Sequence, residues 1–269
     1  MQIIDTHCHI HDSEFNATYD ITIDEQIEAA KAVGVMQYIC VGTSAQSSAA
    51  AVTFAATHDG AYASLALHPH EAAEKGLQTC LKEFHRLEEL LKSKAQKIVA
   101  IGECGLDYYY HPEKAVQNAQ KELFAKHLDL ALAYDLPLIF HIRDAFDDFF
   151  TILDTYAQKG HTIRGVVHSF SAHEQQLQGC LQRGLYIGLN GIMTFTKDAL
   201  QLSAAKSAPL SRLVVETDAP FLTPKPFRGT MCQLKHVVVT AEFLSDLRGE
   251  SLQQFAEATT ANAKSLFSL

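Results

Sequence analysis

Histidine and carboxylate side chains recur along this chain at positions that suit metal binding. His7 and His9 stand two residues apart in DTHCH, and alternate residues of an extended strand project to the same side. Two imidazoles held in this way can chelate one divalent ion. Further ionisable residues stand at or next to the ends of apolar runs: His68, Glu103, His141, His168 and Asp218. This pattern indicates metal-assisted chemistry.

Apolar runs that read as buried strands carry these groups. The runs cover residues 3–9, 35–42, 61–67, 97–103, 136–141, 165–169, 185–191 and 213–218. A polar group at the end of a buried strand costs free energy unless it is satisfied, so its recurrence predicts a shared polar centre. Segments with helical periodicity separate the runs, and capping patterns at Thr22–Glu25, Ser171–Glu174 and Ser251–Gln254 predict three helix starts.

The alternation of strand and helix predicts an α/β fold, a single (β/α)8 TIM barrel that spans residues 1–269. In such a barrel the carboxyl ends of the strands hold the active site. The competing architecture is an open doubly wound sheet, which would place ligands at one switch point. The sequence contains no GxGxxG after its first strand and no GxxxxGK[ST], so a nucleotide-binding open sheet is disfavoured.

Composition narrows the class of protein. The 269 residues are 47% hydrophobic, yet no apolar run approaches the roughly 20 residues that span a bilayer. The N-terminus lacks the basic region of a signal peptide, which predicts a cytoplasmic protein. The formal net charge of −9 weighs against a broad basic surface on duplex nucleic acid. A small site for one phosphodiester or one chain end remains compatible with this charge.

The number of candidate ligands predicts two metal ions. A catalytic ion usually takes three protein ligands and keeps one position open, whereas six strong candidates are present here. We expect Glu103 to bridge the ions, with His7, His9 and Asp218 on one side and His141 and His168 on the other. Two divalent ions and two carboxylates leave a charge of about +2, which favours an anionic substrate.

Four further features have two interpretations each. Arg143 could clamp a phosphate or pair with an aspartate of the following helix, Asp144 or Asp147. Tyr108–Tyr110 could stack on a base or pack a loop over the rim. His68 is expected to act as a general acid or a substrate contact, rather than to be satisfied by backbone. Glu216 shares a strand face with Asp218, and we expect it to orient a ligand histidine rather than bind an ion.

The motifs together resemble the TatD family of metal-dependent deoxyribonucleases, within the amidohydrolase-like barrels. The matching stretches are DTHCH, LHPH, GECGLDYYY, LPLIFHIRDAFDD, VVHSFSA, LNGIMTFTK, ETDAPFLTP and the ending ATTANAKSLF. They run from residue 5 to residue 267, so the resemblance covers nearly the whole chain. It implies the metal ligands His7, His9, Glu103, His141, His168 and Asp218, all of which are present.

The resemblance also implies an activity. We expect a two-metal hydrolase that cleaves phosphodiester bonds in DNA, a 3′–5′ exodeoxyribonuclease that prefers single strands and chain ends. Asp218 would accept a proton from the attacking water, and Arg143 would help to stabilise charge on the phosphoryl oxygens. The resemblance points to Mg²⁺ or Mn²⁺, although imidazole ligands also suit Zn²⁺. We expect a monomer with no membrane attachment and no obligate protein partner.

Two rival functions share this ligand set. The same ions could serve hydrolysis of a carboxylic ester or amide, as in a D-aminoacyl-tRNA deacylase. A metal-loaded binding protein without turnover is the third interpretation. The chain departs from the family pattern at Ser169–Ala172, at Thr230–Gln233 and at His127, where the family often has glutamine. The first two departures stand near the expected site, so they bear on substrate range.

Overall fold

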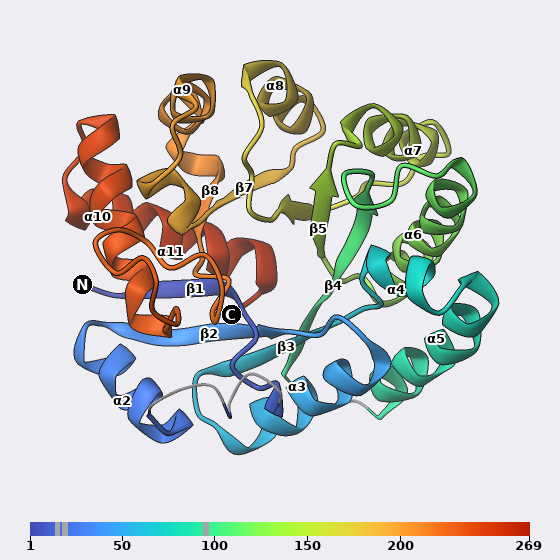
Figure 1. Cartoon of the computed structure of the whole chain (residues 1–269), viewed down its shortest axis with the longest axis horizontal. Coiled ribbons are helices and arrows are strands. Elements are labelled where there is room, and N and C mark those ends of the chain that lie inside the picture. Colours follow the sequence, from blue (N-terminus) through green and yellow to red (C-terminus); the bar gives the residue numbers. More distant parts are fainter. Residues whose placement is uncertain (14–16, 18–20, 94–96) are drawn as a thin grey trace. The chain divides into compact units, whose positions relative to one another are not determined.

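The computed structural model describes residues 1–13, 17, 21–93 and 97–269. Within them, eight strands form one sheet in chain order, with helices between successive strands (Figure 1). This is the order of a (β/α)8 barrel, which confirms the predicted fold class. The strands are β1 (Ile3–Cys8), β2 (Val35–Val41), β3 (Ala61–Leu65), β4 (Ile98–Asp107), β5 (Leu138–Arg143), β6 (Gly165–Val167), β7 (Tyr186–Leu189) and β8 (Leu213–Val215).

The helices keep the chain order of the barrel. They are α2 (Ile23–Ala32), α3 (Ala45–Thr57), α4 (Pro69–Glu74), α5 (Leu77–Lys92), α6 (Lys114–Tyr134), α7 (Phe146–Gln158), α8 (Glu174–Gln182), α9 (Ala199–Ser207), α10 (Val237–Arg248) and α11 (Leu252–Phe267). Short 3₁₀ helices are η1 (Gly191–Thr194), η2 (Leu210–Arg212) and η3 (Leu234–His236). Among the described residues, no helix combines the length and apolar character needed to cross a membrane.

The chain divides into two compact units. The first unit comprises Met1–Cys40, His58–Ala61 and His168–Leu269, and the second comprises Val41–Thr57 and Tyr62–Val167. Predicted site residues fall in both units. The first unit contains His7, His9, His168 and Asp218, and the second contains His68, Glu103, His141 and Arg143.

In the first unit, β1 is held by a partner on each side. It pairs in parallel with β2, from Ile3 opposite Val35 to Cys8 opposite Cys40. Beyond the end of β8 the backbone N–H of Asp218 donates to His7 (2.9 Å), and that of His9 donates to Ala219 (2.7 Å). Helix α11 packs against β1 and β8, at the red end of the chain in Figure 1. These bonds align the DTHCH and ETD motifs.

Two of the three predicted helix starts are confirmed. Thr22 and Glu25 form the capping box that begins α2, with Glu25 N–H donating to Thr22 Oγ1 at 3.2 Å. Ser251 caps α11 by accepting from the N–H of Gln254 at 3.2 Å. The prediction at Ser171 is wrong, because α8 begins at Glu174 after an extended N-cap residue, His173.

The reason for the later start of α8 lies in long-range hydrogen bonds. The N–H of Ser169 donates to Glu216 Oε1 at 2.6 Å, and the N–H of Phe170 donates to Gly188 O at 2.9 Å. These bonds hold the segment after β6 against partners distant in sequence. The helix therefore begins only where the chain leaves those partners.

In the second unit, β4 and β5 form the longest stretch of the parallel ladder described for that unit. Their pairing runs from Ile101 opposite Leu138 to Asp107 opposite Arg143. Helix α6 packs along β4, and the green part of Figure 1 shows α6 and α7 with these strands. An aromatic cluster fills the space beneath the helices: Phe124, Phe140 and Phe149, each at most 1% exposed. Strand β4 ends four residues later than the predicted run, so it includes Asp107.

His127 of α6 is a buried, neutral histidine. Its Nε2 accepts from the N–H of Leu67 at 3.0 Å, and its Nδ1 lies 2.9 Å from Leu123 O, to which it donates. Burial lowers the pKa of His127 from 6.5 to about 4, although the Leu123 hydrogen bond opposes the change. Between these two pH values the unfolded chain binds a proton that the folded chain excludes.

We expect His127→Gln to reduce the loss of stability in acid. Because the folded pKa is lowered, the contribution of neutral His127 is complete above pH 6.5 and is lost as the pH falls toward 4. Glutamine offers one acceptor and one donor group but does not titrate. From pH 7 to pH 5 the wild type should lose about 2 kcal/mol more unfolding free energy than the variant. Urea unfolding at both pH values measures this difference, and equal losses would contradict it.

Candidate functional site

Three donor atoms of the first unit converge at the end of β1. His7 Nε2 and His9 Nε2 lie 3.2 Å apart, and Asp218 Oδ1 lies 3.5 Å from the first and 3.4 Å from the second. His7 is fully buried and His9 is 6% exposed. The predicted chelating pair is thus joined by the predicted carboxylate, and the three residues form one candidate metal group.

The triangle of these atoms fits a single divalent ion. Donor atoms about 2.1 Å from an ion are about 3.0–3.4 Å apart when they subtend 90–110° at it. Two of the three separations, 3.2 and 3.4 Å, lie within this range, and the third, 3.5 Å, exceeds it by 0.1 Å. Two imidazole nitrogens and one carboxylate oxygen also form a common catalytic ligand set.

The backbone and the neighbouring rings fix the Asp218 carboxylate. Asp218 has φ = 62°, in the left-handed region that aspartate tolerates better than most residues. Burial alone would raise the pKa of this carboxyl, but the hydrogen bond with His9 and the charges of His168 and His7 outweigh burial and lower it. Asp218 is therefore an ionised donor that faces imidazoles.

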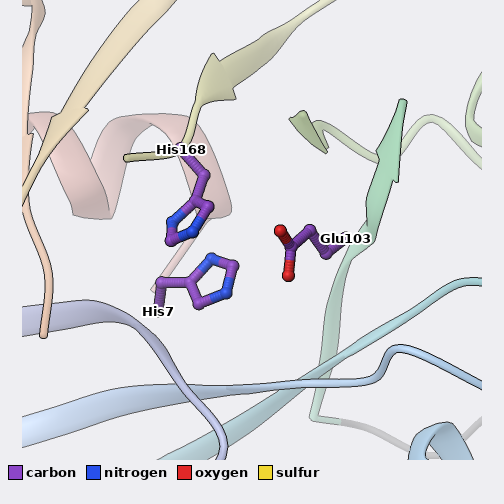
Figure 2. A group of neighbouring side chains, drawn as sticks. All are labelled: His7, Glu103 and His168. Atoms are coloured by element: carbon purple, nitrogen blue, oxygen red, sulfur yellow. The ribbon is translucent and has the colours of Figure 1, made fainter. Parts of the chain in front are cut away.

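His168 joins this cluster from the end of β6. Its ring stacks on that of His7 (Figure 2), and the ring centroids are 3.5 Å apart with planes 19° from parallel. Its Nε2 lies 3.7 Å from Asp218 Oδ1, and its Nδ1 lies 2.8 Å from Glu216 Oε1. Glu216 is fully buried, and its position beside His168 agrees with the expectation that it orients this histidine, a role that stays a prediction. The assignment of His168 to the second ion stays a prediction.

The second unit contains its own donor group. Glu103 lies within β4 and is 5% exposed, and it is the carboxylate labelled in Figure 2. Glu103 Oε1 lies 2.7 Å from His141 Nδ1 and 3.5 Å from His68 Nε2. The three residues form a candidate metal group. His68 is the N-cap of α4, where its Nδ1 accepts from the N–H of His70 at 3.3 Å and so directs Nε2 toward Glu103.

Asp107 is a candidate site residue that we did not predict. Its Oδ2 lies 3.0 Å from His141 Nε2 and 3.1 Å from His70 Nε2, and the side chain is fully buried. His141 therefore lies between two carboxylates, Glu103 and Asp107. The sequence did contain a signal, because residues 103, 105 and 107 alternate along one strand and so share a face.

The charges in this group depend on one another. Burial disfavours charge on His141, but hydrogen bonds with Asp107 and Glu103 outweigh burial and raise its pKa to about 9. Burial also opposes ionisation of Asp107, but hydrogen bonds with His141 and His70 hold its pKa well below the usual range. Burial and the nearby charge of His141 lower the pKa of His68 to about 4.

This arrangement suits a metal ligand. A ligand histidine offers one nitrogen to the ion and donates its other N–H to a carboxylate or carbonyl. Asp107 can hold the Nε2–H of His141, which leaves Nδ1 on the side of Glu103. The donor set of Glu103, His141 and neutral His68 then fits a divalent ion.

Arg143 lies at the exposed end of β5 and does not pair with the aspartates of the next helix. Its guanidinium carbon lies 4.0 Å from the ring centroid of Tyr109 and 4.7 Å from that of Tyr110. Among the described residues no ion pair of Arg143 is found. Tyr108 instead packs inward, and its hydroxyl donates to Asp148 Oδ2 at 2.7 Å. Tyr108 thus packs the loop, as the second interpretation predicts, whereas base stacking by Tyr109 and Tyr110 stays a prediction.

Two of the three departures from the family pattern, Ser169–Ala172 and Thr230–Gln233, lie in the first unit. Ser169 has φ = 50° and accepts at Oγ from Asn190 Nδ2 at 2.9 Å, while its N–H binds Glu216. In the stretch Thr230–Gln233, Cys232 is fully buried. The preceding Arg228 lies over the ring of Phe195 at 4.0 Å. Ser169 therefore contacts Glu216, the carboxylate that lies beside His168.

Comparisons with known proteins agree with this geometry. The family model described as TatD-related DNase matches residues 4–268. The chain is 34% identical over 265 residues to YabD of Bacillus subtilis, named an uncharacterised metal-dependent hydrolase, with 98% of each chain covered. It is 33% identical over 260 residues to the 3′–5′ ssDNA/RNA exonuclease TatD of Cronobacter sakazakii, with 94% of each chain covered. The crystal structure of YjjV, a TatD homologue of Escherichia coli K12, is similar with a TM-score of 0.87 and 30% identity, over 99% of this chain and 98% of that one.

We expect Asp107→Asn to weaken metal binding in the second unit by about 10- to 100-fold, because His141 loses the carboxylate that orients it. Titration calorimetry with Zn²⁺ and a competing chelator measures this change. Asp148→Asn is the matched control, since Asp148 lies on α7 and binds Tyr108 and Lys121 instead. Equal Zn²⁺ affinities for the two variants would contradict the role of Asp107.

We expect Gly188→Ala to act like the loss of Glu216. A Cβ at Gly188 would lie 2.5 Å from Glu216 Oε2, and the buried carboxylate must then turn away from His168. Zn²⁺ affinity of the first unit should fall by about 10- to 100-fold, as it should in Glu216→Gln. Adding the substitution at Gly188 to Glu216→Gln should cause little further loss. Wild-type affinity in Gly188→Ala would contradict this coupling.

Proposed function

The chain belongs to the TatD-related DNase family, and from this premise we propose that it is a two-metal hydrolase that removes nucleotides from the 3′ end of single-stranded DNA. The observation that carries the proposal is the pair of histidine–carboxylate donor groups, one in each unit. The relative from Cronobacter sakazakii is named a 3′–5′ ssDNA/RNA exonuclease, which supports both the polarity and the preference for single strands.

The proposed metal ligands are those predicted from the sequence. His7, His9 and Asp218 would hold one ion, His141 and His168 would hold the other, and Glu103 would serve as a ligand of both. Mg²⁺ or Mn²⁺ would support nuclease activity, and the imidazole-rich donor sets also suit Zn²⁺. When bound, two such ions lower the pKa of water and stabilise charge on the attacking and leaving oxygens.

Asp218, Arg143 and His68 have proposed roles in the reaction. Asp218 is ionised, because the neighbouring histidines lower its pKa despite burial, and this carboxylate is the proposed acceptor of a proton from the attacking water. Arg143 offers guanidinium N–H groups to a phosphoryl oxygen. His68 contacts the substrate or an ion through Nε2, the nitrogen that faces Glu103 at 3.5 Å.

We further propose that residues 1–269 form one domain that works as a cytoplasmic monomer without an obligate protein partner. The family model covers residues 4–268 without a break, which supports a single catalytic domain. The relatives have the same extent, since YabD is matched over 98% of both chains.

Digestion of a 3′-labelled single-stranded DNA oligomer tests the proposed activity. In Mg²⁺ or Mn²⁺ the wild type should release the label and then shorten the oligomer stepwise. Glu103→Ala should lose more than about 100-fold of this rate, because the carboxylate is the proposed ligand of both ions. Glu122→Ala, which removes an exposed glutamate from α6, is the matched control and should retain the wild-type rate.

Other outcomes would identify a different function. Full activity in Glu103→Ala would contradict the two-metal proposal. An intact oligomer, together with hydrolysis of a D-aminoacyl-tRNA by the same metal-loaded protein, would favour acyl-ester hydrolysis. Binding of both substrates without product would favour a protein that binds and does not turn over.

A further inference from the structure

An exposed surface of two tyrosines and one arginine lies at the ends of β4 and β5. Tyr109 is 57% exposed and Tyr110 is 56% exposed. The guanidinium of Arg143 lies over both rings, 4.0 Å and 4.7 Å from their centroids. We call these three residues the aromatic shelf. Such exposure is unusual for large aromatic side chains that serve only to pack a loop.

The backbone of the shelf is fixed although its side chains are open. The N–H of Tyr108 donates to Arg143 O at 2.9 Å, and the N–H of Tyr110 donates to Asp107 Oδ1 at 3.1 Å. Register pairs Asp107 with Arg143 across β4 and β5. The inward Tyr108 anchors the loop through its bond to Asp148. The shelf is therefore presented on a rigid support, which suits a binding surface.

The shelf adjoins the donor group of the second unit. Asp107 joins them directly, since one of its oxygens accepts from Tyr110 and the other lies 3.0 Å from His141 Nε2. The ring of His70 continues this contact, 5.5 Å from the Tyr110 ring and 4.5 Å from the His68 ring between centroids. A ligand on the shelf would thus lie beside the groups proposed to carry the chemistry.

The chemistry of the shelf selects one class of ligand. Aromatic faces stack on nucleobases of any sequence, and arginine strengthens such stacking through its own planar group. The N–H edge of a guanidinium stacked on a ring remains available for a phosphate. The described residues supply no ion pair that would neutralise Arg143. A base with an attached phosphate satisfies both features at once.

We propose that the aromatic shelf is a nucleotide subsite that stacks on one unpaired base and holds its phosphate. This inference rests on the proposed function, and the substrate feature that the subsite recognises is an unpaired base. A base within a duplex has both faces covered by its neighbours, so only an unpaired base can stack on Tyr109 or Tyr110. The preference for single strands then follows from stacking and not from a basic groove.

Two single-stranded DNA oligomers test the subsite, one normal and one abasic in its three 3′-terminal nucleotides. For the wild type, kcat/KM should favour the normal oligomer by about 10- to 100-fold. In the double variant Tyr109→Ala, Tyr110→Ala this ratio should fall toward one, mainly through KM. The double variant with phenylalanine should restore the ratio. Tyr134→Ala, which removes a 38% exposed tyrosine from α6, should keep it.

Binding measured without divalent ions separates this inference from the proposed function. Fluorescence anisotropy should show the same preference for bases in the wild type and its loss in the alanine double variant. Arg143→Gln should reduce the slope of log affinity against log salt by about 0.7, the value for one phosphate of a single strand.

Either of two results would overturn the subsite: a wild-type ratio near one in both assays, or an alanine double variant that keeps the wild-type ratio in both. Base-dependent binding without cleavage would instead reject the exonuclease proposal and support the subsite. Because both rings are exposed, circular dichroism should show that the double variants fold like the wild type.

Discussion

Imidazole and carboxylate groups buried at the ends of apolar strands must satisfy one another, and the local structure around each donor group follows from this constraint. Asp5, which lies within β1, must likewise find polar partners. It is fully buried, and its oxygens accept from Thr217 Oγ1 at 2.6 Å, from Thr217 N–H at 2.9 Å and from His7 N–H at 3.3 Å. Burial raises its pKa to about 7 in spite of these bonds. One carboxylate thereby ties the strand that carries the histidine pair to the segment that carries Asp218.

A buried carboxylate also lies beside one candidate ligand histidine in each unit. Glu216 Oε1 lies 2.8 Å from Nδ1 of His168 in the first unit, and Asp107 Oδ2 lies 3.0 Å from Nε2 of His141 in the second. A neutral imidazole has one donor and one acceptor nitrogen, so a carboxylate on one side determines which nitrogen can bind an ion. In the first unit the carboxylate lies at Nδ1, which leaves Nε2 of His168 for an ion. In the second unit it lies at Nε2, which leaves Nδ1 of His141. A donor set prepared in this way needs little rearrangement to accept a divalent ion.

The aromatic shelf beside the second donor group depends on exposed rings and one cation, not on buried ion pairs. The chain as a whole is acidic, with a formal net charge of −9, and a protein of this charge does not attract nucleic acid over its entire surface. Recognition of the proposed nucleic-acid substrate must then be local. Arg143 lies between exposed rings instead of beside a carboxylate, so its charge is available where the strand ends meet the loop. Aromatic faces and one cation supply short-range contacts that do not depend on the overall charge.

The sequence alone was sufficient for features that arise from neighbours along the chain. His7 and His9 share a side because a strand alternates, and Thr22 and Ser251 begin helices because their side chains reach the backbone three residues ahead. The alternating order of strands and helices also lies along the chain, and it was enough to predict the barrel. Six candidate ligands could also be named, since each stands at or next to the end of an apolar run.

Only the tertiary structure decided which distant groups meet. Asp107 became a partner of His141 because β4 extends to it and pairs with β5 in one particular register. Ser171 failed as a helix start because bonds to Glu216 and Gly188 hold the preceding residues. Arg143 had aspartates close in sequence, yet it lies over two tyrosines. In each case the deciding contact joins residues whose distance depends on strand register and packing, which local sequence patterns do not specify.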